Sequence, residues 1–232
     1  MRKAFISRDL QTNSVFYQKL TVAGWEVHGQ SLIRFSPVSF KTIPRADWLF
    51  LYSSNGVRFF FQNYYHPCQD SPGKKKGPPI TYPARWAALG PGTAKALQKY
   101  GISPDFIGNG NPAETALAFQ KLAGGQTVLF IRAKNSRQSI QSLLEKHLNA
   151  LDLIVYENIA KTTFTLPHFD CLVFTSPLNV RTYFKKYPLQ KDQQIVAIGN
   201  TTAKALADMG ITKYRIAQQP TEKALVEAVI NS

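Results

Sequence analysis

Hydroxyl, amide and glycine residues gather where strand-like stretches of this 232-residue sequence end. Serine and threonine hydroxyls, asparagine amides and the backbone N–H groups at a helix start can together bind carboxylate or phosphate groups. Arginines at the ends of two further stretches could add positive charge. The candidate anion-binding residues are Arg8, Ser53, Ser54, Asn55, Gly92, Thr93, Arg132, Ser176, Asn200, Thr201 and Thr202. These residue types favour a surface that holds an anionic molecule.

A purely structural role is the alternative for several of these residues. Ser53 and Ser176 could serve only as helix caps, because serine is a preferred N-cap residue. Thr93, Thr201 and Thr202 could be caps as well. For Ser176 the cap is strongly indicated, since the proline that follows it suits the first helical position.

The sequence contains no recognisable catalytic or metal-binding pattern. No nucleophile stands beside a base, no paired carboxylates occur, and the glycine-rich nucleotide fingerprints are missing. Two isolated cysteines, Cys68 and Cys171, predict free thiols, and the four histidines are scattered. We therefore predict neither a cofactor nor a metal.

Two long segments of the chain repeat. Ala88–Ile102 recurs as Ala197–Ile211 with nine of fifteen residues identical (197 − 88 = 109). Asp47–Phe61 recurs as Asp170–Phe184 (170 − 47 = 123). The offsets differ by 123 − 109 = 14 residues, which places an insertion of that length in the 64–83 stretch, where we interpret the lysine triplet at 74–76 as a mobile solvated loop.

The second half also repeats the N-terminus, with Phe5 aligned on Phe130 (130 − 5 = 125). Strand and helix patterns alternate through both copies, which predicts an α/β fold with two similar parallel sheets and helices on both faces. Glycines 101 and 210 are expected to end helices. Strands are expected at 3–7, 25–27, 32–35, 47–52, 86–90, 105–108, 127–131, 152–156, 170–175, 194–199 and 214–217, and helices at 9–23 and from 57, 112 and 220.

The formal charge of +14 indicates a polyanionic partner. A nucleic-acid binder is one possibility, but no basic-aromatic motif or recognition helix is visible. No apolar run is long enough for a membrane span, and the N-terminus lacks the apolar core of a signal peptide. These features predict a cytoplasmic protein without a nucleic-acid or membrane partner.

The ordered motifs resemble those of the uroporphyrinogen-III synthase family. They are DWLFLYSSNGVRFF, ALGPGTAKALQKYGI, VLFIRA, VYENIA, DCLVFTSPLNVRTYF and AIGNTTAKALADMGI. The resemblance implies two α/β domains joined by a two-segment extended connection, with an active-site cleft between them. One domain would combine residues 1–35 with 161–232, and the other would span 36–160. The repeat alone would instead divide the chain once, near Gly124.

The same resemblance implies a hydro-lyase of haem and porphyrin (tetrapyrrole) biosynthesis. Its substrate would be hydroxymethylbilane, a linear tetrapyrrole with eight carboxylates, cyclised with loss of water and inversion of ring D. Tyr156 matches the tyrosine that assists departure of the hydroxyl, and Thr93 and Thr202 would line opposite walls of the cleft. A monomer without cofactor is implied. The alternative from another class is a non-enzymatic, two-lobed binding protein for an anionic small molecule.

Overall fold

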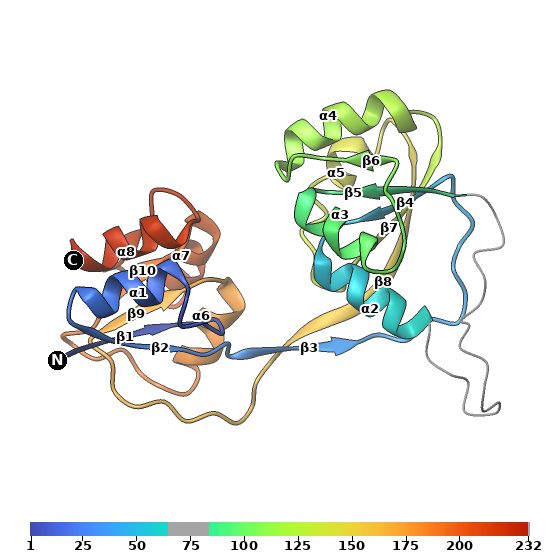
Figure 1. Ribbon diagram of the computed structural model, residues 1–232. Helices are drawn as coiled ribbons and strands as arrows, with labels where there is room; N and C mark the ends of the chain where they lie inside the picture. Colours follow the sequence, from blue (N-terminus) through green and yellow to red (C-terminus); the bar gives the residue numbers. More distant parts are fainter. Residues whose placement is uncertain (65–83, 232) are drawn as a thin grey trace. The chain divides into compact units, whose positions relative to one another are not determined.

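The computed structural model describes residues 1–64 and 84–231, so the predicted insertion with its lysine triplet and Cys68 lie outside the described residues. The chain divides into two compact units. Unit 1 combines Met1–Arg34 with Ile159–Ser232, and unit 2 is Phe35–Asn158. In Figure 1 unit 1 therefore carries both the blue and the orange-red ends of the chain. The sequence-based domains were 1–35 with 161–232, and 36–160.

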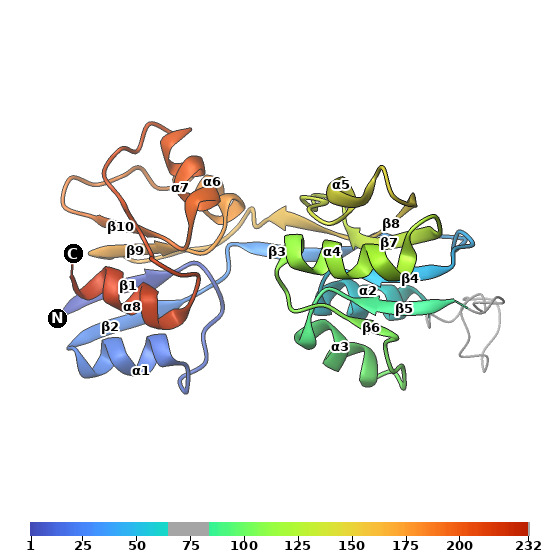
Figure 2. The same ribbon diagram turned by 90° about the horizontal axis from the view of Figure 1, so that it is seen from above.

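Unit 1 is built on a five-stranded sheet of order β11-β10-β9-β1-β2, in which every neighbouring pair is parallel. Helices cover both faces, α1 and α8 on one and α6 and α7 on the other (Figure 2). The strands are β1 (Arg2–Ile6), β2 (Trp25–Gly29), β9 (Cys171–Phe174), β10 (Gln194–Ala197) and β11 (Arg215–Ile216), and the helices are α1 (Val15–Val22), α6 (Pro177–Phe184), α7 (Asn200–Ala207) and α8 (Glu222–Ile230).

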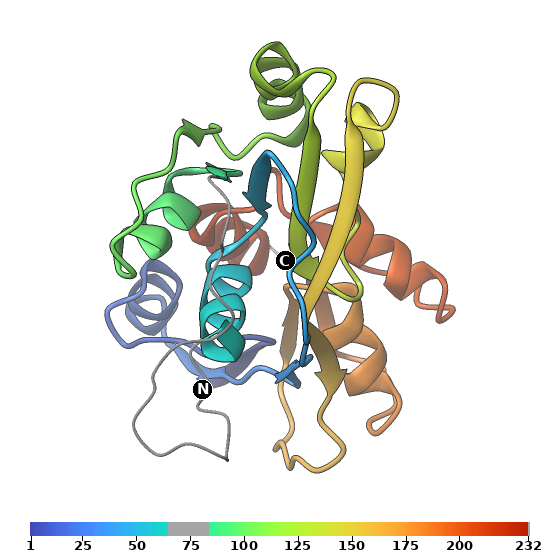
Figure 3. The ribbon, with the colours of Figure 1, turned by 90° about the vertical axis from the view of Figure 1, so that its right-hand side faces the viewer.

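Unit 2 holds a six-stranded sheet of order β3-β8-β7-β4-β5-β6. Figure 3 shows the long strand β8 beside β7, to which it is parallel. The chain passes between the units within β3 and near the end of β8, so both connections are extended. The strands are β3 (Ile33–Pro37), β4 (Trp48–Leu51), β5 (Arg85–Ala88), β6 (Phe106–Ile107), β7 (Thr127–Ala133) and β8 (Asn149–Ala160), and the helices are α2 (Ser54–Tyr64), α3 (Pro91–Gln98), α4 (Pro112–Ala123) and α5 (Gln141–Leu144).

Continuous apolar strands form the centre of both sheets. In β4, Leu49 and Leu51 pack with the α2 and α3 side, whereas Trp48 and Phe50 pack with α4 and α5. Successive side chains of a strand point to opposite faces, so a strand covered by helices on both faces must be apolar throughout. The prediction of an α/β fold is confirmed, with two sheets that are largely parallel.

Strand pairing corrects one alignment of the repeat. Trp48 of β4 pairs with Val128, and its counterpart Cys171 of β9 pairs with Ala4, so the offset is 128 − 4 = 124. The predicted offset of 125, with Phe5 on Phe130, was wrong by one residue. Because both faces of these strands are buried, the apolar run carries no period that could fix the register. The corrected offset aligns Arg8 with Arg132 (132 − 8 = 124).

Several helix boundaries also differ from those expected. Helix α1 begins at Val15 rather than near residue 9, because the Ser14 hydroxyl accepts from the Tyr17 N–H (3.2 Å) and caps it there. Helix α2 begins at residue 54, three residues before the expected start. Pro220 does not open α8; the hydroxyl of Thr221 caps that helix. A cap fixes the first turn more strongly than a loose apolar period does.

Other start and stop signals are confirmed. Pro112 and Pro177 each occupy the first turn of a helix, capped by Asn111 and Ser176. Gly101 and Gly210 follow α3 and α7 with φ angles of 75° and 76°, a left-handed conformation that ends helices and favours glycine. Within 1–64 and 84–231, no helix is both long and apolar enough to cross a membrane.

The aspartate that precedes each central strand explains part of the repeat. The Asp47 carboxylate accepts from the Thr127 N–H (2.8 Å), and Asp170 accepts from the Lys3 N–H (2.6 Å). Each carboxylate therefore binds an N–H group of the first or second residue of the neighbouring strand. The same contact thus lies at the start of the central pair of strands in both units.

Candidate active site

Tyr156 and Ser53 meet at the carboxyl end of the sheet of unit 2. Tyr156 comes from β8 and Ser53 follows β4, and the Tyr156 Oη lies 3.2 Å from the Ser53 Oγ. The Tyr156 ring is 7% exposed, stacked on Phe59 at 5.1 Å between ring centroids and edge-on to Phe35 at 5.9 Å. Packing therefore holds the ring, and the serine lies within hydrogen-bond distance of its hydroxyl.

Ser53 has the capping role that was its structural alternative, in addition to this contact. Its Oγ accepts a hydrogen bond from the Gly56 N–H (3.1 Å), three residues ahead in α2. A hydroxyl has one donor and two acceptor sites, so the cap leaves capacity for Tyr156. The tyrosine hydroxyl thus lies at the N-terminus of a helix.

The predicted binding residues of unit 2 lie at the starts of two neighbouring helices. The Ser54 hydroxyl donates to the Gly92 carbonyl (3.1 Å), which joins the first turns of α2 and α3. Asn55 is half-buried in the first turn of α2. Thr93 is only 6% exposed and does not cap α3; Gly90 occupies the cap position. The structure therefore brings Ser53, Ser54, Asn55, Gly92, Thr93 and Tyr156 to the same end of the unit.

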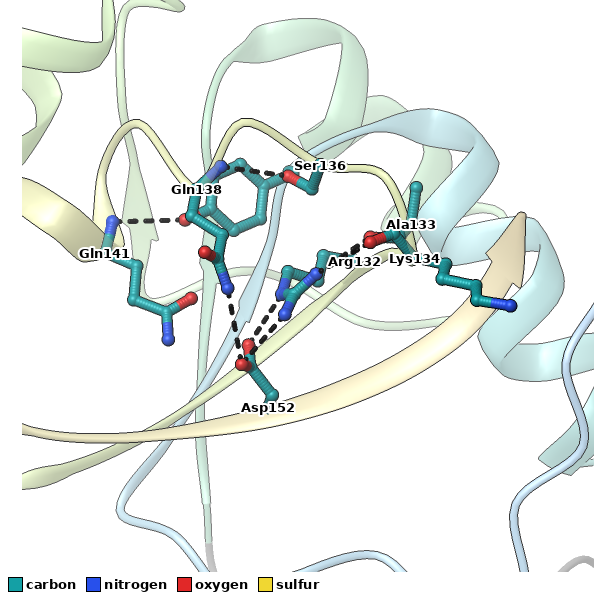
Figure 4. Close-up of polar contacts among 8 residues, drawn as sticks. Arg132, Ala133, Lys134, Ser136, Gln138, Gln141 and Asp152 are labelled. Atoms are coloured by element: carbon teal, nitrogen blue, oxygen red, sulfur yellow. Dashed lines mark hydrogen bonds and ion pairs between the residues drawn. The ribbon is translucent and has the colours of Figure 1, made fainter. Parts of the chain in front are cut away.

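Arg132 has a structural set of partners (Figure 4). Its Nε and Nη2 donate to the two carboxylate oxygens of Asp152, at 2.6 and 2.9 Å, and its Nη1 donates to the carbonyl oxygens of Ala133 (3.0 Å) and Lys134 (3.4 Å). The hydrogen bonds from Arg132 lower the pKa of the Asp152 carboxyl below its usual value. The guanidinium, with its residue 8% exposed, is thus bound within unit 2.

Tyr52 and a glutamine-rich loop complete this cluster. The Tyr52 hydroxyl accepts from the backbone N–H of Gln141 (3.1 Å), and burial raises the pKa of Tyr52 to about 12. The side chain of Gln138, whose backbone φ is 52°, donates to Asp152 (3.4 Å). The ring of Tyr52 and the Arg132–Asp152 pair therefore stabilise the loop after β7.

In unit 1 the equivalent serine is engaged differently. Ser176 accepts from the backbone N–H of Asn179 (3.3 Å) and also from its side-chain amide (3.0 Å). Asn179, 2% exposed, further donates to the Ser7 carbonyl (2.9 Å) and accepts from the Leu32 N–H (2.9 Å). The hydroxyls of Ser7 and Thr175 lie 3.2 Å apart beside this network. Ser176 is thus confirmed as a cap, and an amide covers it.

The remaining predicted residues of unit 1 lie around α7 and β1. Asn200 and Thr201 are exposed in the first turn of α7, whereas Thr202 is 1% exposed; none of the three is the cap residue, which is Gly199. Arg8 forms an ion pair with Glu222 at the start of α8, and that carboxylate also accepts from the Phe16 N–H (2.9 Å). Arg8, like Arg132, therefore has a carboxylate partner within its own unit.

Sequence reasoning missed Asp152, Glu222 and Asn179. Glu222 lies 214 residues from Arg8, so no local signal could have paired them. Asp152 of β8 pairs with Phe130 of β7, two residues before Arg132. The ion pair could therefore have been predicted only if the register of these two strands had been known. Asn179 falls in the recognised repeat, opposite Gly56 (179 − 56 = 123), and this difference between the copies was the available signal.

The described residues, 1–64 and 84–231, contain no cluster of three or more His, Cys, Asp or Glu that could hold a metal ion. Cys171 is a free, buried thiol, and burial together with the nearby Asp170 raises its pKa to about 12. A thiol is nucleophilic and binds metals as the thiolate, so this cysteine serves as a core residue.

The fold and site define a class: a two-unit α/β protein with parallel sheets and hydroxyl-rich helix starts at their carboxyl ends. The family model described as uroporphyrinogen-III synthase HemD matches residues 14–227. A uroporphyrinogen-III synthase from Chlorobaculum parvum is 30% identical over 91% of this chain and 91% of its own. A putative uroporphyrinogen-III synthase from Methanocaldococcus jannaschii is 31% identical over 62% of this chain and 65% of its own.

Solved structures agree on the fold. Uroporphyrinogen-III synthetase from Helicobacter pylori superposes with a TM-score of 0.72 at 23% identity, covering 100% of this chain and 99% of its own. A mutant uroporphyrinogen III synthase from Thermus thermophilus gives 0.56 at 17% identity, covering 100% of both chains. This chain belongs to the uroporphyrinogen-III synthase (HemD) family. The family's activity is that of a hydro-lyase acting on hydroxymethylbilane in tetrapyrrole biosynthesis.

Proposed function

We propose that this chain cyclises hydroxymethylbilane to uroporphyrinogen III with loss of water and inversion of ring D, and that Tyr156 is the catalytic residue. The observation that carries the assignment of Tyr156 is its position: a packed ring whose hydroxyl lies 3.2 Å from Ser53 at the start of α2. A hydroxyl held at a helix N-terminus can hydrogen-bond to a departing oxygen.

The reaction begins at the hydroxymethyl group of the bilane. Its C–O bond breaks as the adjacent pyrrole supplies an electron pair, and the oxygen leaves as water, assisted by the Tyr156 hydroxyl directly or through a water molecule. The substituted carbon of ring D then attacks the methylene carbon that the hydroxyl has left, which gives a spiro intermediate. The older bond of that ring D carbon, to the bridge from ring C, breaks, ring D turns over, and its free α-carbon bonds to the bridge and loses its proton. Because the bilane also closes unaided to the uninverted isomer, the protein must mainly hold it in one geometry.

The eight carboxylates of the bilane are bound by hydroxyl groups and backbone N–H groups at helix starts. In unit 2 these are the first turns of α2 and α3, with Ser54, Asn55, Gly92 and Thr93; in unit 1 they are the first turns of α6 and α7, with Ser176, Asn200, Thr201 and Thr202. Helix N-termini attract anions, each by about 0.3–1 kcal/mol. The charge of +14 adds a general attraction.

Arg8 and Arg132 support the site rather than bind the carboxylates of the substrate. Each is paired with a carboxylate of its own unit, Glu222 and Asp152 respectively. Exchanging such a partner for a substrate carboxylate would leave a charged group unpaired, which is costly where the pair is buried. Their role in this proposal is to fix the strand ends from which the hydroxyl groups project.

The monomeric state and the cytoplasmic location predicted from the sequence complete the proposal. Light scattering of the purified chain tests the first, and a mass of twice 26.0 kDa would refute it. Fractionation of the producing cells tests the second.

Incubation with hydroxymethylbilane tests the activity. The products are oxidised to porphyrins and the isomers are separated by chromatography. The proposal predicts uroporphyrinogen III as the main product, whereas the uninverted isomer alone would refute it.

A further inference from the structure

The two units place the same serine in different surroundings. The strand pairing aligns Ser53 with Ser176 and Gly56 with Asn179 (176 − 53 = 179 − 56 = 123), and Ile131 with Ser7 (131 − 7 = 124). In unit 1 the Asn179 amide donates to the Ser176 Oγ and to the Ser7 carbonyl. Unit 2 has no side chain at that position.

Gly56 faces the two groups that correspond to the acceptors of Asn179. A Cβ atom at Gly56 would lie 3.5 Å from the Ser53 Oγ and 3.6 Å from the Ile131 carbonyl oxygen, which is ordinary van der Waals contact. The φ of Gly56 is not positive, so the backbone does not require glycine there. Glycine within a helix costs about 0.5–1 kcal/mol relative to alanine. Neither the conformation nor a clash at Cβ therefore accounts for this glycine.

The Tyr156 hydroxyl makes the contact that Asn179 makes in unit 1. The Tyr156 Oη lies 3.2 Å from the Ser53 Oγ. Tyr156 comes from β8, which corresponds to β2 of unit 1, since Leu151 pairs in its sheet as His28 does in the other (151 − 28 = 123). Leu32, which follows β2, reaches Ser176 only through Asn179. A longer polar side chain at position 56 would compete with the tyrosine for Ser53.

We infer that Ser53 is a positioning residue for the Tyr156 hydroxyl, and that position 56 must stay without a long side chain to keep this pair intact. The inference rests on the proposed function for its catalytic consequence, but the hydroxyl contact itself does not depend on activity. Unit 2 then presents a tyrosine hydroxyl at the start of its helix, whereas unit 1 presents an amide-covered cap.

The decisive variant is Gly56→Asn, which copies unit 1 into unit 2. Its amide is expected to donate to the Ser53 Oγ and the Ile131 carbonyl and to displace the Tyr156 hydroxyl. The rate of uroporphyrinogen III formation should fall by about 10- to 100-fold, the range expected for a misplaced catalytic group. Gly56→Ala adds only the Cβ atom, so its rate of uroporphyrinogen III formation should stay within about threefold of that of the unaltered chain.

A second readout does not require turnover. The chain is labelled with tyrosine carrying ¹³C at Cζ, and the Tyr156 resonance is assigned by its loss in Tyr156→Phe. We expect Gly56→Asn and Ser53→Ala to shift this resonance and Gly56→Ala to leave it close to that of the unaltered chain. If the unaltered chain forms no uroporphyrinogen III, the proposed function fails, and the resonance still decides the positioning role.

Unfolding curves identify a variant that does not fold. If Gly56→Asn is unfolded, Ser53→Ala decides alone, since it adds no volume. An unshifted Tyr156 resonance in the folded variants would overturn the inference. It would also be overturned if Gly56→Asn formed uroporphyrinogen III as fast as Gly56→Ala.

Discussion

The two units share a scaffold but differ in the groups at its carboxyl end. Five strands correspond one to one in the two sheets, and in each unit a serine caps the helix after the central strand. In unit 1 Asn179 covers that serine, and in unit 2 a tyrosine hydroxyl faces it. The repeated framework thus accounts for the shape of both units, and the residues that differ between them indicate where the chemistry lies.

The equivalent arginines differ in the same way. Arg132 is almost buried and makes two hydrogen bonds to Asp152 and two to carbonyl groups. The side chains of Arg8 and Glu222 are 33% and 27% exposed, whereas that of Arg132 is 9% exposed, so the contrast between the pairs lies in the arginine and not in its partner Asp152, which is 34% exposed. Water weakens a pair at the surface, whereas a buried charge without its partner is strongly destabilising. The same residue at the same sheet position should therefore contribute unequally to stability.

Replacing Arg132 should have the largest effect on stability. Arg132→Ala is expected to lower the free energy of unfolding by about 3 kcal/mol, because it removes the packing of a buried side chain and deprives both the Lys134 carbonyl and Asp152 of their arginine donor. Urea denaturation measures the change. Arg132→Lys is the control, because lysine keeps the charge but not the paired donors of arginine. Its free energy of unfolding should lie between those of the unaltered chain and Arg132→Ala. A loss below about 1 kcal/mol in Arg132→Ala would contradict the assigned role.

Acid should weaken the same pair. Arg132 lowers the pKa of Asp152 in the folded chain below its usual value of 3.8. The contribution of the pair is therefore present above the unfolded pKa and is lost as the pH falls through the folded value. Asp152→Asn should flatten this part of the stability profile, which urea denaturation at a series of acidic pH values measures.

Removing the amide of unit 1 should have the next largest effect. Asn179→Ala leaves the buried Leu32 N–H without its partner and takes from the Ser7 carbonyl one of its two donors, the other being the Thr175 hydroxyl, at a cost of about 2 kcal/mol. The matched change in unit 2, Gly56→Ala, should instead stabilise by about 0.5–1 kcal/mol. Thermal or urea unfolding distinguishes the two. If Asn179→Ala and Gly56→Ala changed the free energy of unfolding equally and in the same direction, this helix position would not differ in role between the two units.

Alkaline pH should expose a further difference, since Tyr52 of unit 2 stands where unit 1 has Thr175 (175 − 52 = 123). Burial raises the pKa of Tyr52 from 10.0 to about 12 in the folded chain. The neutral phenol therefore contributes stability that is fully present below pH 10 and is lost as the pH rises toward about 12. Tyr52→Phe should lose less stability over this range than the unaltered chain, as measured by urea denaturation.

Arg8→Ala should have the smallest effect, a loss of no more than about 1 kcal/mol. Its partner Glu222 keeps the Phe16 N–H and is partly open to water, so its charge remains solvated. A loss as large as that of Arg132→Ala would remove the contrast between the two units.

Most of the fold could be predicted because the sequence repeats itself. The offsets of 109 and 123 reappear in the strand pairing: Arg85 and Gln194 pair with Trp48 and Cys171 (194 − 85 = 109; 171 − 48 = 123). The one-residue error at Phe5 arose where both faces of a strand are apolar. Helix α2 begins earlier and helix α1 later than the sequence predicted, because each start is fixed by a serine cap that a loose apolar pattern does not reveal.

The site could be predicted only in part. Hydroxyl groups after strands identified Ser53, and the resemblance of VYENIA identified Tyr156, but their contact spans 103 residues. Arg8 pairs with a carboxylate 214 residues away, and Arg132 pairs with one 20 residues away on the neighbouring strand, so neither ion pair was visible in the sequence. The meaning of Gly56 emerged only when its position could be compared with the side chain of Asn179.

Product analysis with Tyr156→Phe tests the central claim most directly. Hydroxymethylbilane is supplied to the unaltered chain, to Tyr156→Phe and to Tyr52→Phe, which removes a hydroxyl elsewhere in unit 2. The account predicts that Tyr156→Phe folds but forms uroporphyrinogen III roughly 100-fold more slowly, with the uninverted isomer accumulating instead, while Tyr52→Phe keeps the activity. Uroporphyrinogen III formed by Tyr156→Phe at the unaltered rate would contradict it.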